Sequence, residues 1–341
     1  MKIAVLGSGS WGTALAKVLG ENQHDVMMWG RDDSLAGEIN QTQTNSRYLP
    51  QTKLPETLIA TTSLSEAIKS AELILVVIPT NAIRPVMTQV NDLLVKGDQP
   101  IIVHATKGLE QNSQLRISQV IEAVIDRELY QDLVVLSGPS HAEEVARKDL
   151  TTVTAASDSL ESAKIVQSVF MNEYFRVYTN TDVIGVEVGA ALKNIIALGA
   201  GLLAGLGYGD NAKAALITRG LAEISRLGVK MGADPLTFSG LSGVGDLIVT
   251  CTSPHSRNWQ AGKLIAQGLS REEIFEKIDM VVEGILTCQA AYELANKFEI
   301  EMPITEALYR KLYEEASVEE SLRGLMMREG KQEASLDNHL N

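Results

Sequence analysis

Lys193 borders the longest apolar stretch of the chain, which covers residues 195–208. On a helix it shares one stripe with Val186, Ala190 and Ala197, because residues three and four apart lie on the same face. A lysine among small apolar side chains either extends its ammonium group to solvent or is desolvated. Desolvation lowers the pKa of a lysine toward neutrality, which suits a group that transfers protons, and the small neighbours leave room for a substrate. Lys193 is therefore our candidate for proton transfer.

Residues 7–12 read GSGSWG, a GxGxxG pattern directly after one apolar run and at the start of a helical pattern. In such a turn Gly7 permits the tight bend, Gly9 lets a pyrophosphate approach the backbone, and Gly12 lets helix and strand pack closely. The N–H groups at the helix start then receive phosphates. Because strand, glycines, helix and second strand follow in order within about 30 residues, we interpret the segment as a dinucleotide-binding turn rather than an incidental one.

The second strand is followed by Arg31, with Asp32 only afterwards. NAD-binding sheets usually place an acid here for the ribose 2′-hydroxyl, whereas a guanidinium suits the 2′-phosphate of NADP. The alternative is a solvated arginine on a loop, and Asp32 could still bind a ribose. The sequence thus favours NADP, with NAD possible.

Further polar residues follow other predicted strands, where ligands bind in open α/β sheets. Lys107 follows one strand, and Ser140 lies in the segment 137–141 (SGPSH) after another. Taken alone, the lysine fits a surface position and the serine an ordinary helix N-cap before residue 141. Asp246 ends the segment GVGD in a backbone-permissive turn. It becomes an orienting partner, or an acceptor for a substrate hydroxyl, if it meets Lys193.

Ser256, Arg257 and Asn258 follow a proline and precede a helical pattern. A serine cap, an arginine in the first turn and free N–H groups would suit a phosphate monoester. An ordinary helix cap explains the same residues equally well.

Composition and other motifs exclude several classes of protein. A net charge of −13 argues against a nucleic-acid platform, although a local basic pocket remains compatible with it. The five histidines lack metal-ligand spacing, and neither HExxH nor GxSxG occurs, so we expect no metal and no acyl-enzyme. Two distant cysteines indicate a reducing compartment. The first apolar run is too short for a signal peptide and no stretch reaches the ~20 residues of a membrane span, so we expect a soluble cytoplasmic protein.

The elements that must position these residues divide the chain in two. Short apolar runs, alternating with helical patterns, predict strands over 2–6, 25–29, 73–78, 100–105, 132–136 and 151–155. This predicts an α/β N-terminal domain over 1–182, a Rossmann-like doubly wound parallel sheet. Helical patterns over 183–206, 211–231, 258–267, 271–278, 287–297 and 304–315 predict an all-α C-terminal domain over 183–341, with a tail that frays from about residue 328.

Together these motifs resemble the bacterial NAD(P)-dependent sn-glycerol-3-phosphate dehydrogenase family. The resemblance runs from residue 1 to about 315 and rests on the segments GSGSWGTALA (7–16), VVIPTNAIR (76–84), HATKGLE (104–110), LSGPSHAEEVA (136–146), EVGAALKNIIALGAG (187–201), GLSGVGDLIVTCTSPHSRNW (240–259) and VVEG (281–284). It implies reversible reduction of dihydroxyacetone phosphate to sn-glycerol 3-phosphate for phospholipid synthesis, by a cytoplasmic homodimer that binds neither nucleic acid nor membrane.

The resemblance also implies roles for individual residues. Lys193 matches the catalytic lysine. Substrate-binding positions are Lys107, Gly138, Ser140, Lys193, Asp246, Ser256, Arg257 and Asn258. Cofactor-binding positions, with the glycines Gly7, Gly9 and Gly12, are Ser10, Trp11, Arg31, Asp32, Tyr48, Lys107, Ala142, Arg257, Val281 and Glu283.

Two alternatives remain at this stage. One is another lysine-dependent Rossmann dehydrogenase, of the β-hydroxyacid, phosphogluconate or ketopantoate type, against which the segments around Asp246 and Arg257 argue. The other is a dinucleotide-sensing protein without turnover, in which Lys193 would be structural.

Overall fold

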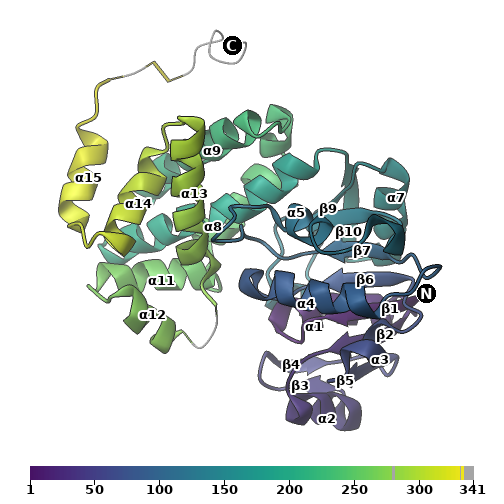
Figure 1. The fold of residues 1–341 in the computed structure, drawn as a ribbon. Helices are drawn as coiled ribbons and strands as arrows, with labels where there is room; N and C mark the ends of the chain where they lie inside the picture. The colour runs from purple at the N-terminus through teal and green to yellow at the C-terminus, as the bar shows by residue number, and fades with distance from the viewer. Residues whose placement is uncertain (279–280, 331, 334–341) are drawn as a thin grey trace.

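The computed structural model describes residues 1–278, 281–330 and 332–333 of the chain. Figure 1 shows a sheet with helices on both faces at one end of the molecule and a group of helices at the other. The strands lie between Lys2 and Asn180, and the regular elements from Val183 onward are helical among the described residues. The α/β and all-α parts predicted from the sequence are both present.

The main sheet has eight strands in the order β10-β9-β8-β7-β6-β1-β2-β5. These are β1 (Lys2–Leu6), β2 (Asp25–Trp29), β5 (Leu58–Thr61), β6 (Leu73–Val76), β7 (Ile101–His104), β8 (Leu133–Ser137), β9 (Thr151–Ala156) and β10 (Phe175–Asn180), while β3 (Thr44–Asn45) and β4 (Leu49–Lys53) form a separate pair. The predicted strands are confirmed. β5, β10 and the β3–β4 pair were not predicted.

The predicted parallel sheet is confirmed, with an antiparallel pairing at one edge. Strands β5, β2, β1, β6, β7 and β8 are parallel to one another. Strand β9 is antiparallel to β8, and β10 is parallel to β9, so both run opposite to the rest of the sheet. The connection from β8 to β9 contains only the short helix α6 (Ala142–Ala146). A helix of this length rises about 8 Å, whereas a five-residue strand is about 17 Å long. The connection is therefore too short to lead back to the edge of the sheet where β8 begins. As a result, β9 starts beside the end of β8 and runs antiparallel to it.

Helices cover both faces of this sheet, as the continuous apolar strands predict. On one face, Ile3 and Val5 of β1 belong to the same core as residues of α1 (Ser10–Glu21), α2 (Asp33–Thr42), α6 and α7 (Leu160–Phe170). On the other face, Ala4 and Leu6 belong to the core shared with α3 (Leu64–Ile68), α4 (Thr80–Leu93) and α5 (Ile117–Glu122). Helix α5 ends at Glu122, and the turn η1 (Arg127–Leu129) follows separately.

The helical part is built around α8 (Val183–Gly205), whose residues are nearly all buried. The other elements are α9 (Asp210–Lys230), η2 (Pro235–Ser239), η3 (Leu241–Gly245), α10 (Asp246–Thr252), α11 (Arg257–Ala266), α12 (Arg271–Lys277), α13 (Glu283–Phe298), α14 (Pro303–Tyr313) and α15 (Val318–Met326). Asp182 caps α8, accepting a 2.8 Å hydrogen bond from the N–H of Gly185. The six predicted helices are confirmed, whereas η2, η3, α10 and α15 were not predicted.

Small residues let α11 approach α8 closely. A Cβ atom on Gly201 would overlap the carbonyl oxygen of Trp259. Among the described residues, α8 is the one helix long and apolar enough to cross a membrane, and 89% of its apolar window is buried inside the protein. Its apolar character is thus that of a core helix surrounded by other helices.

Candidate active site

Four side chains meet where α8, α10 and the end of β7 converge, and we call them the lysine–aspartate cluster: Lys107, Lys193, Asp246 and Thr250. Lys193 is 5% exposed; its Nζ contacts Oδ1 of Asp246 and donates a 2.8 Å hydrogen bond to Oγ1 of Thr250. Asp246 is 1% exposed, and its Oδ2 accepts a 2.8 Å hydrogen bond from Nζ of Lys107. The sequence left open whether Asp246 meets Lys193, and the structure brings the two together.

Lys107 reaches this cluster from the sheet. It follows β7, and its Nζ also donates a 3.0 Å hydrogen bond to the carbonyl oxygen of Gly138, which follows β8. Ser140 does not cap α6, contrary to our expectation. Its hydroxyl instead turns back to the same Gly138 carbonyl at 3.0 Å, and α6 begins after His141 without a side-chain cap. Gly138 and Ser140 therefore help to hold Lys107 rather than a helix end.

Burial and charge determine the protonation of the cluster. Burial lowers the pKa of Lys193 to about 7, although the carboxylate of Asp246 favours its charged form. Burial raises the pKa of Asp246, but the ammonium groups of Lys107 and Lys193 outweigh this and hold it below its usual range. An ionised carboxylate thus faces a lysine that gains and loses a proton near neutral pH, as a general acid and base must.

Asp246 is not a loop residue, which corrects the interpretation of GVGD as a turn. The glycine-rich segment forms the π-type turn η3, and Asp246 is the first residue of α10. Thr250 lies one helical turn later and therefore faces the same side, where its hydroxyl meets Lys193. Thr250 was not predicted, because the sequence pattern around it did not indicate a helix.

The turn after β1 has the geometry that a dinucleotide requires. Gly7 has a φ of +128°, and a Cβ atom there would overlap the backbone of Val77; a Cβ atom on Gly12 would overlap the carbonyl of Gly7. A Cβ atom on Gly9, by contrast, would meet no protein atom within 4 Å. The protein's own packing requires Gly7 and Gly12, while the space above Gly9 is open at the start of α1, where N–H groups lack helical partners. These residues fit a pyrophosphate.

Other predicted cofactor residues surround this turn. Ser10 donates a 3.2 Å hydrogen bond to the carbonyl of Tyr48, which brings the β3–β4 segment against the start of α1. The indole Nε1 of Trp11 is buried without a hydrogen-bond partner among the described residues. Arg31 is exposed at the end of β2, whereas Asp32 caps α2 through the N–H of Leu35. Arg31 is therefore better placed than Asp32 to bind a ligand.

A third group of predicted residues joins the two parts of the chain. Glu283, at the start of α13, accepts hydrogen bonds from the N–H (3.1 Å) and the hydroxyl (2.8 Å) of Thr80 at the start of α4. Burial raises the pKa of Glu283. Ala142 is buried at the start of α6, and the carbonyl of Val281 accepts a 3.1 Å hydrogen bond from Arg257. Thr80 lies in the segment VVIPTNAIR (76–84), which carries part of the family resemblance, but it was not among the predicted site residues.

For residues 256–258 the sequence left two interpretations open, an ordinary helix cap and a site for a phosphate, and the structure has features of both. Ser256 caps α11 through the N–H of Trp259, as an ordinary cap does. Asn258 is buried; its amide donates to Asn194 at 2.9 Å and accepts from the N–H of Gly284 at 2.8 Å. Arg257 is exposed in part, but burial lowers the pKa of its guanidinium, which has Glu283 and Glu143 as charged neighbours. Asn258 thus holds three helices together, while Arg257 is placed for an anion.

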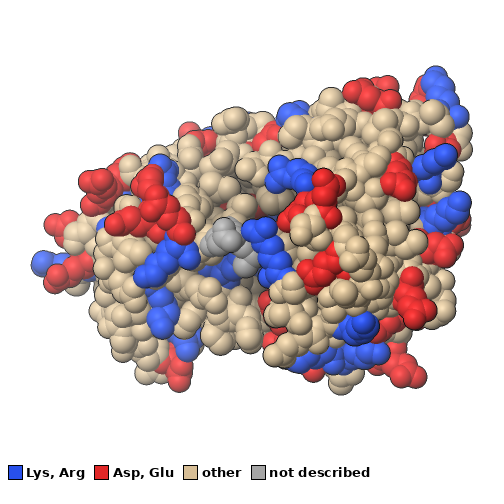
Figure 2. All heavy atoms as spheres, turned by 90° about the horizontal axis from the view of Figure 1, so that it is seen from below, with Lys and Arg blue, Asp and Glu red and all other residues tan. Residues whose placement is uncertain are grey.

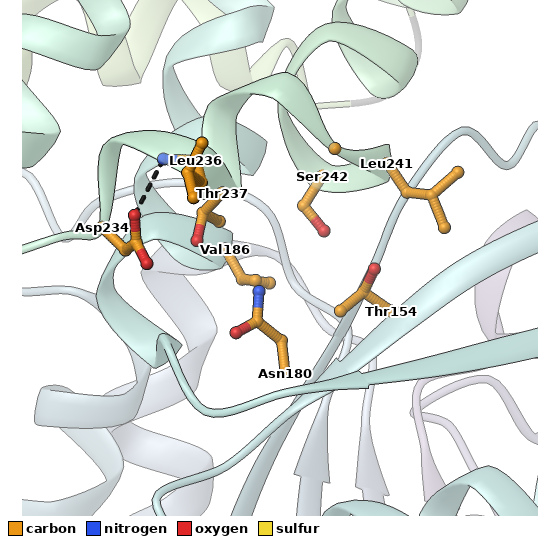
Figure 3. Close-up of a pocket in the computed structure, with 9 residues that line it drawn as sticks. Thr154, Asn180, Val186, Asp234, Leu236, Thr237, Leu241 and Ser242 are labelled. Atoms are coloured by element: carbon orange, nitrogen blue, oxygen red, sulfur yellow. Dashed lines mark hydrogen bonds between the residues drawn. The ribbon is translucent and has the colours of Figure 1, made fainter.

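The protein has a hollow on its surface and, separately, a cavity behind η3. In Figure 2 a hollow near the centre of the view separates two lobes, and Lys and Arg side chains lie beside it. A cavity of about 200 Å³ lies elsewhere, behind η3 (Figure 3); Thr154, Asn180, Val186, Asp234, Leu236, Thr237, Gly240, Leu241 and Ser242 line it. None of the predicted site residues lines this cavity. Because the proton-transferring groups lie in the cluster, we place the candidate site there.

Comparison with known proteins identifies the family. The family model "NAD-dependent glycerol-3-phosphate dehydrogenase N-terminus" matches residues 2–163, and the model for the C-terminus matches residues 182–323. The chain belongs to this family. It is 60% identical over 333 residues to glycerol-3-phosphate dehydrogenase [NAD(P)+] of Ligilactobacillus salivarius, covering 97% of this chain and 98% of that protein. It is 59% identical to the Enterococcus faecalis protein of the same name, covering 97% of both.

A solved structure leads to the same family. The crystal structure of glycerol-3-phosphate dehydrogenase from Coxiella burnetii has a TM-score of 0.89 and 38% identity, and the match covers 96% of this chain and 98% of that one. Membership of the glycerol-3-phosphate dehydrogenase family makes this chain an NAD(P)-dependent oxidoreductase. It favours that activity over the β-hydroxyacid and ketopantoate alternatives and over a protein without turnover.

Proposed function

We propose that this protein catalyses the reversible reduction of dihydroxyacetone phosphate to sn-glycerol 3-phosphate, which supplies phospholipid synthesis. The observation that carries the proposal is the buried contact between Lys193 and Asp246, with Lys107 on the second carboxylate oxygen. Family membership supports the choice of substrate. A ketone reductase needs a hydride donor, a proton donor and an anchor for the rest of the substrate, and this chain has residues for all three.

The dinucleotide would bind on the turn of Gly7, Gly9 and Gly12, with Ser10, Trp11, Tyr48, Ala142, Val281 and Glu283 around it. When bound, its reduced nicotinamide supplies the hydride. Arg31 would bind a 2′-phosphate, so NADPH is preferred and NADH is accepted. The open space above Gly9 and the exposed position of Arg31 support this assignment.

Lys193 would donate the proton that the developing alkoxide of the substrate needs, and would accept it again in the reverse direction. Asp246 stays ionised and keeps the ammonium group of Lys193 directed to one place. Lys107, held by Gly138 and Asp246, would stabilise the negative charge on the substrate oxygen. Burial of the cluster strengthens each of these interactions because water does not screen them.

Arg257 would bind the substrate phosphate at the start of α11. The guanidinium is exposed there, and the first N–H groups of a helix attract an anion. Ser256 and Asn258 would complete this anchor, and Ser140 with Gly138 would contact the middle of the substrate.

The proposal also covers the two domains and the oligomeric state of the protein. Residues 1–182 would form the dinucleotide-binding unit and residues 183–341 the substrate unit of a cytoplasmic homodimer without nucleic-acid or membrane partners. Light scattering coupled to size-exclusion chromatography tests the dimer.

Initial rates test the activity. We expect NADPH oxidation at 340 nm with dihydroxyacetone phosphate, slower oxidation with NADH, and little with ketopantoate or a β-ketoacid. A protein that binds NADPH yet oxidises it with none of these ketones would contradict the proposal.

A further inference from the structure

The carboxylate of Glu187 is buried where α8 meets the sheet. Glu187 is 5% exposed and lies on the same helix as Lys193, about 9 Å nearer its N-terminus. Its Oε1 accepts a 2.8 Å hydrogen bond from the N–H of Ser118, and its Oε2 accepts one of 2.6 Å from the Ser118 hydroxyl. Arg116 contacts the same Oε2, and Nε2 of His104 lies 3.1 Å from Oε1.

All three partners of Glu187 belong to the sheet side of the molecule. His104 is the last residue of β7, and the chain continues directly from it to Lys107. Arg116 and Ser118 lie at the start of α5. The carboxylate therefore ties the helix that carries Lys193 to the strand that delivers Lys107.

These two elements hold the two halves of the proton-transfer site. Lys193 reaches Asp246 from α8, while Lys107 reaches the other oxygen of Asp246 from the end of β7. Outside the cluster, the side-chain amide of Asn194 on α8 donates a 3.5 Å hydrogen bond to the carbonyl of Lys107 after β7. A change in the distance between α8 and β7 would therefore pull one lysine away from Asp246.

The surroundings of Glu187 keep it charged. Burial raises the pKa of this carboxyl, but His104, Arg116 and Ser118 outweigh burial and lower it to about 2. The carboxyl group of Glu187 is thus ionised at neutral pH.

We propose that Glu187 is a positioning residue for proton transfer: by accepting hydrogen bonds from Arg116 and Ser118, with Nε2 of His104 3.1 Å away, it sets the separation of Lys193 and Lys107 across Asp246. The inference rests on the proposed function. Nothing in the proposed substrate or cofactor contacts involves Glu187, so its effect must pass through the placement of the two lysines.

The test is Glu187→Gln, which keeps the size of the side chain and removes its charge and one acceptor. Because a misplacement of about 1 Å costs on the order of 10²-fold in rate, we expect kcat per folded molecule to fall by about 10- to 100-fold. The Kd of NADPH, measured by fluorescence, should change less than about threefold, since the turn after β1 is untouched. The pH at which kcat for reduction is halved should fall, because Lys193 loses part of its contact with Asp246.

Glu223→Gln is the matched control. Glu223 is also a buried carboxyl group on a helix; it is 1% exposed and accepts hydrogen bonds from the N–H groups of Ile304 (2.7 Å) and Thr305 (3.2 Å) at the start of α14. Burial raises the pKa of Glu223 to about 7, so the two variants are compared above that pH, where both carboxyl groups are ionised. Glu223→Gln should lower the melting temperature and leave kcat and the pH profile of the folded enzyme unchanged. Glu187→Asp keeps the charge on a shorter side chain, so its kcat should exceed that of Glu187→Gln but stay more than about threefold below wild type. It also covers the case in which Glu187→Gln does not fold.

The proposal is overturned if Glu187→Gln, or Glu187→Asp where the former does not fold, retains kcat per folded molecule within about threefold of wild type. It is equally overturned if Glu223→Gln lowers kcat as much as Glu187→Gln, because any buried carboxylate would then have the same effect. Wild-type enzyme that reduces no dihydroxyacetone phosphate would instead refute the proposed function.

Discussion

The lysine–aspartate cluster and the two arginines proposed to bind phosphates differ in how much of their environment the protein itself supplies. Lys193 and Asp246 are buried and in contact with each other, and Lys107 and Thr250 complete their hydrogen bonds. Arg31 and Arg257 are exposed, and the guanidinium of Arg257 donates a 3.1 Å hydrogen bond to the backbone carbonyl of Val281.

The difference indicates where each kind of group gains its effect. A proton donor needs a fixed position and a pKa near neutrality, and both require burial and charged neighbours in the folded protein. A phosphate brings its own charge, so an arginine that binds it can remain solvated until the ligand arrives. We therefore expect substitutions in the cluster to act on kcat and substitutions of the arginines to act on KM.

The largest effect is expected for Lys193→Met. It removes the proton donor while keeping the length of the side chain, so kcat should fall by about 10²- to 10⁴-fold, toward the upper value because stabilisation of the substrate oxygen is lost too. Stopped-flow or steady-state rates with dihydroxyacetone phosphate measure it, and NADPH binding should survive.

Lys17→Met is the control for Lys193→Met, because Lys17 is also a buried lysine, 5% exposed and paired with Glu21 at 2.6 Å. It should leave kcat unchanged. Retention of more than about a tenth of wild-type kcat by Lys193→Met would assign the proton to another group or to water.

Asp246→Asn should have a smaller effect, about 10- to 100-fold on kcat, the range expected for a hydrogen bond to a charged group. The pH dependence of kcat shows in which direction the pKa of Lys193 shifts. Reduction needs protonated Lys193, so in wild type its rate falls as pH rises through the Lys193 pKa of about 7, and oxidation falls as pH drops below it. Asp246 raises that pKa, so its loss should move both limbs to lower pH. Unshifted limbs would show that the titrating group is not Lys193.

Arg257→Ala should act mainly on KM for dihydroxyacetone phosphate. One charged hydrogen-bonding group on a phosphate contributes about 1.5–3 kcal/mol, so kcat/KM should fall about 10- to 100-fold. Unphosphorylated dihydroxyacetone is the control substrate, and its kcat/KM should be nearly unaffected. An equal loss for both substrates would place the phosphate anchor elsewhere.

The smallest effect is expected for Arg31→Ala. A solvent-exposed ion pair contributes little, about 1 kcal/mol, so KM for NADPH should rise about fivefold while KM for NADH stays constant. Competition between the two cofactors measures the ratio directly. Equal changes in both KM values would remove Arg31 from the choice between NADPH and NADH.

The sequence by itself determined the local features. The order of strand, glycines and helix marked the turn at residues 7–12, and helical periodicity marked α8 with Lys193 in a small, apolar stripe. These patterns repeat within a few residues, so neighbouring side chains report them directly. Two features were not predicted: the antiparallel turn into β9 and the helix that begins at Asp246. Short or glycine-rich segments carry little periodicity, so the sequence does not indicate their structure.

Only the tertiary structure decided which groups act together. Lys193 meets Asp246 across 53 positions, Lys107 meets it across 139, and Glu187 meets Ser118 across 69. Neither a lysine nor an aspartate shows in its own surroundings which distant residue will balance its charge. Burial and partner together lower the pKa of Lys193 and keep Asp246 ionised, and both arise only when the helices close over the carboxyl ends of the strands.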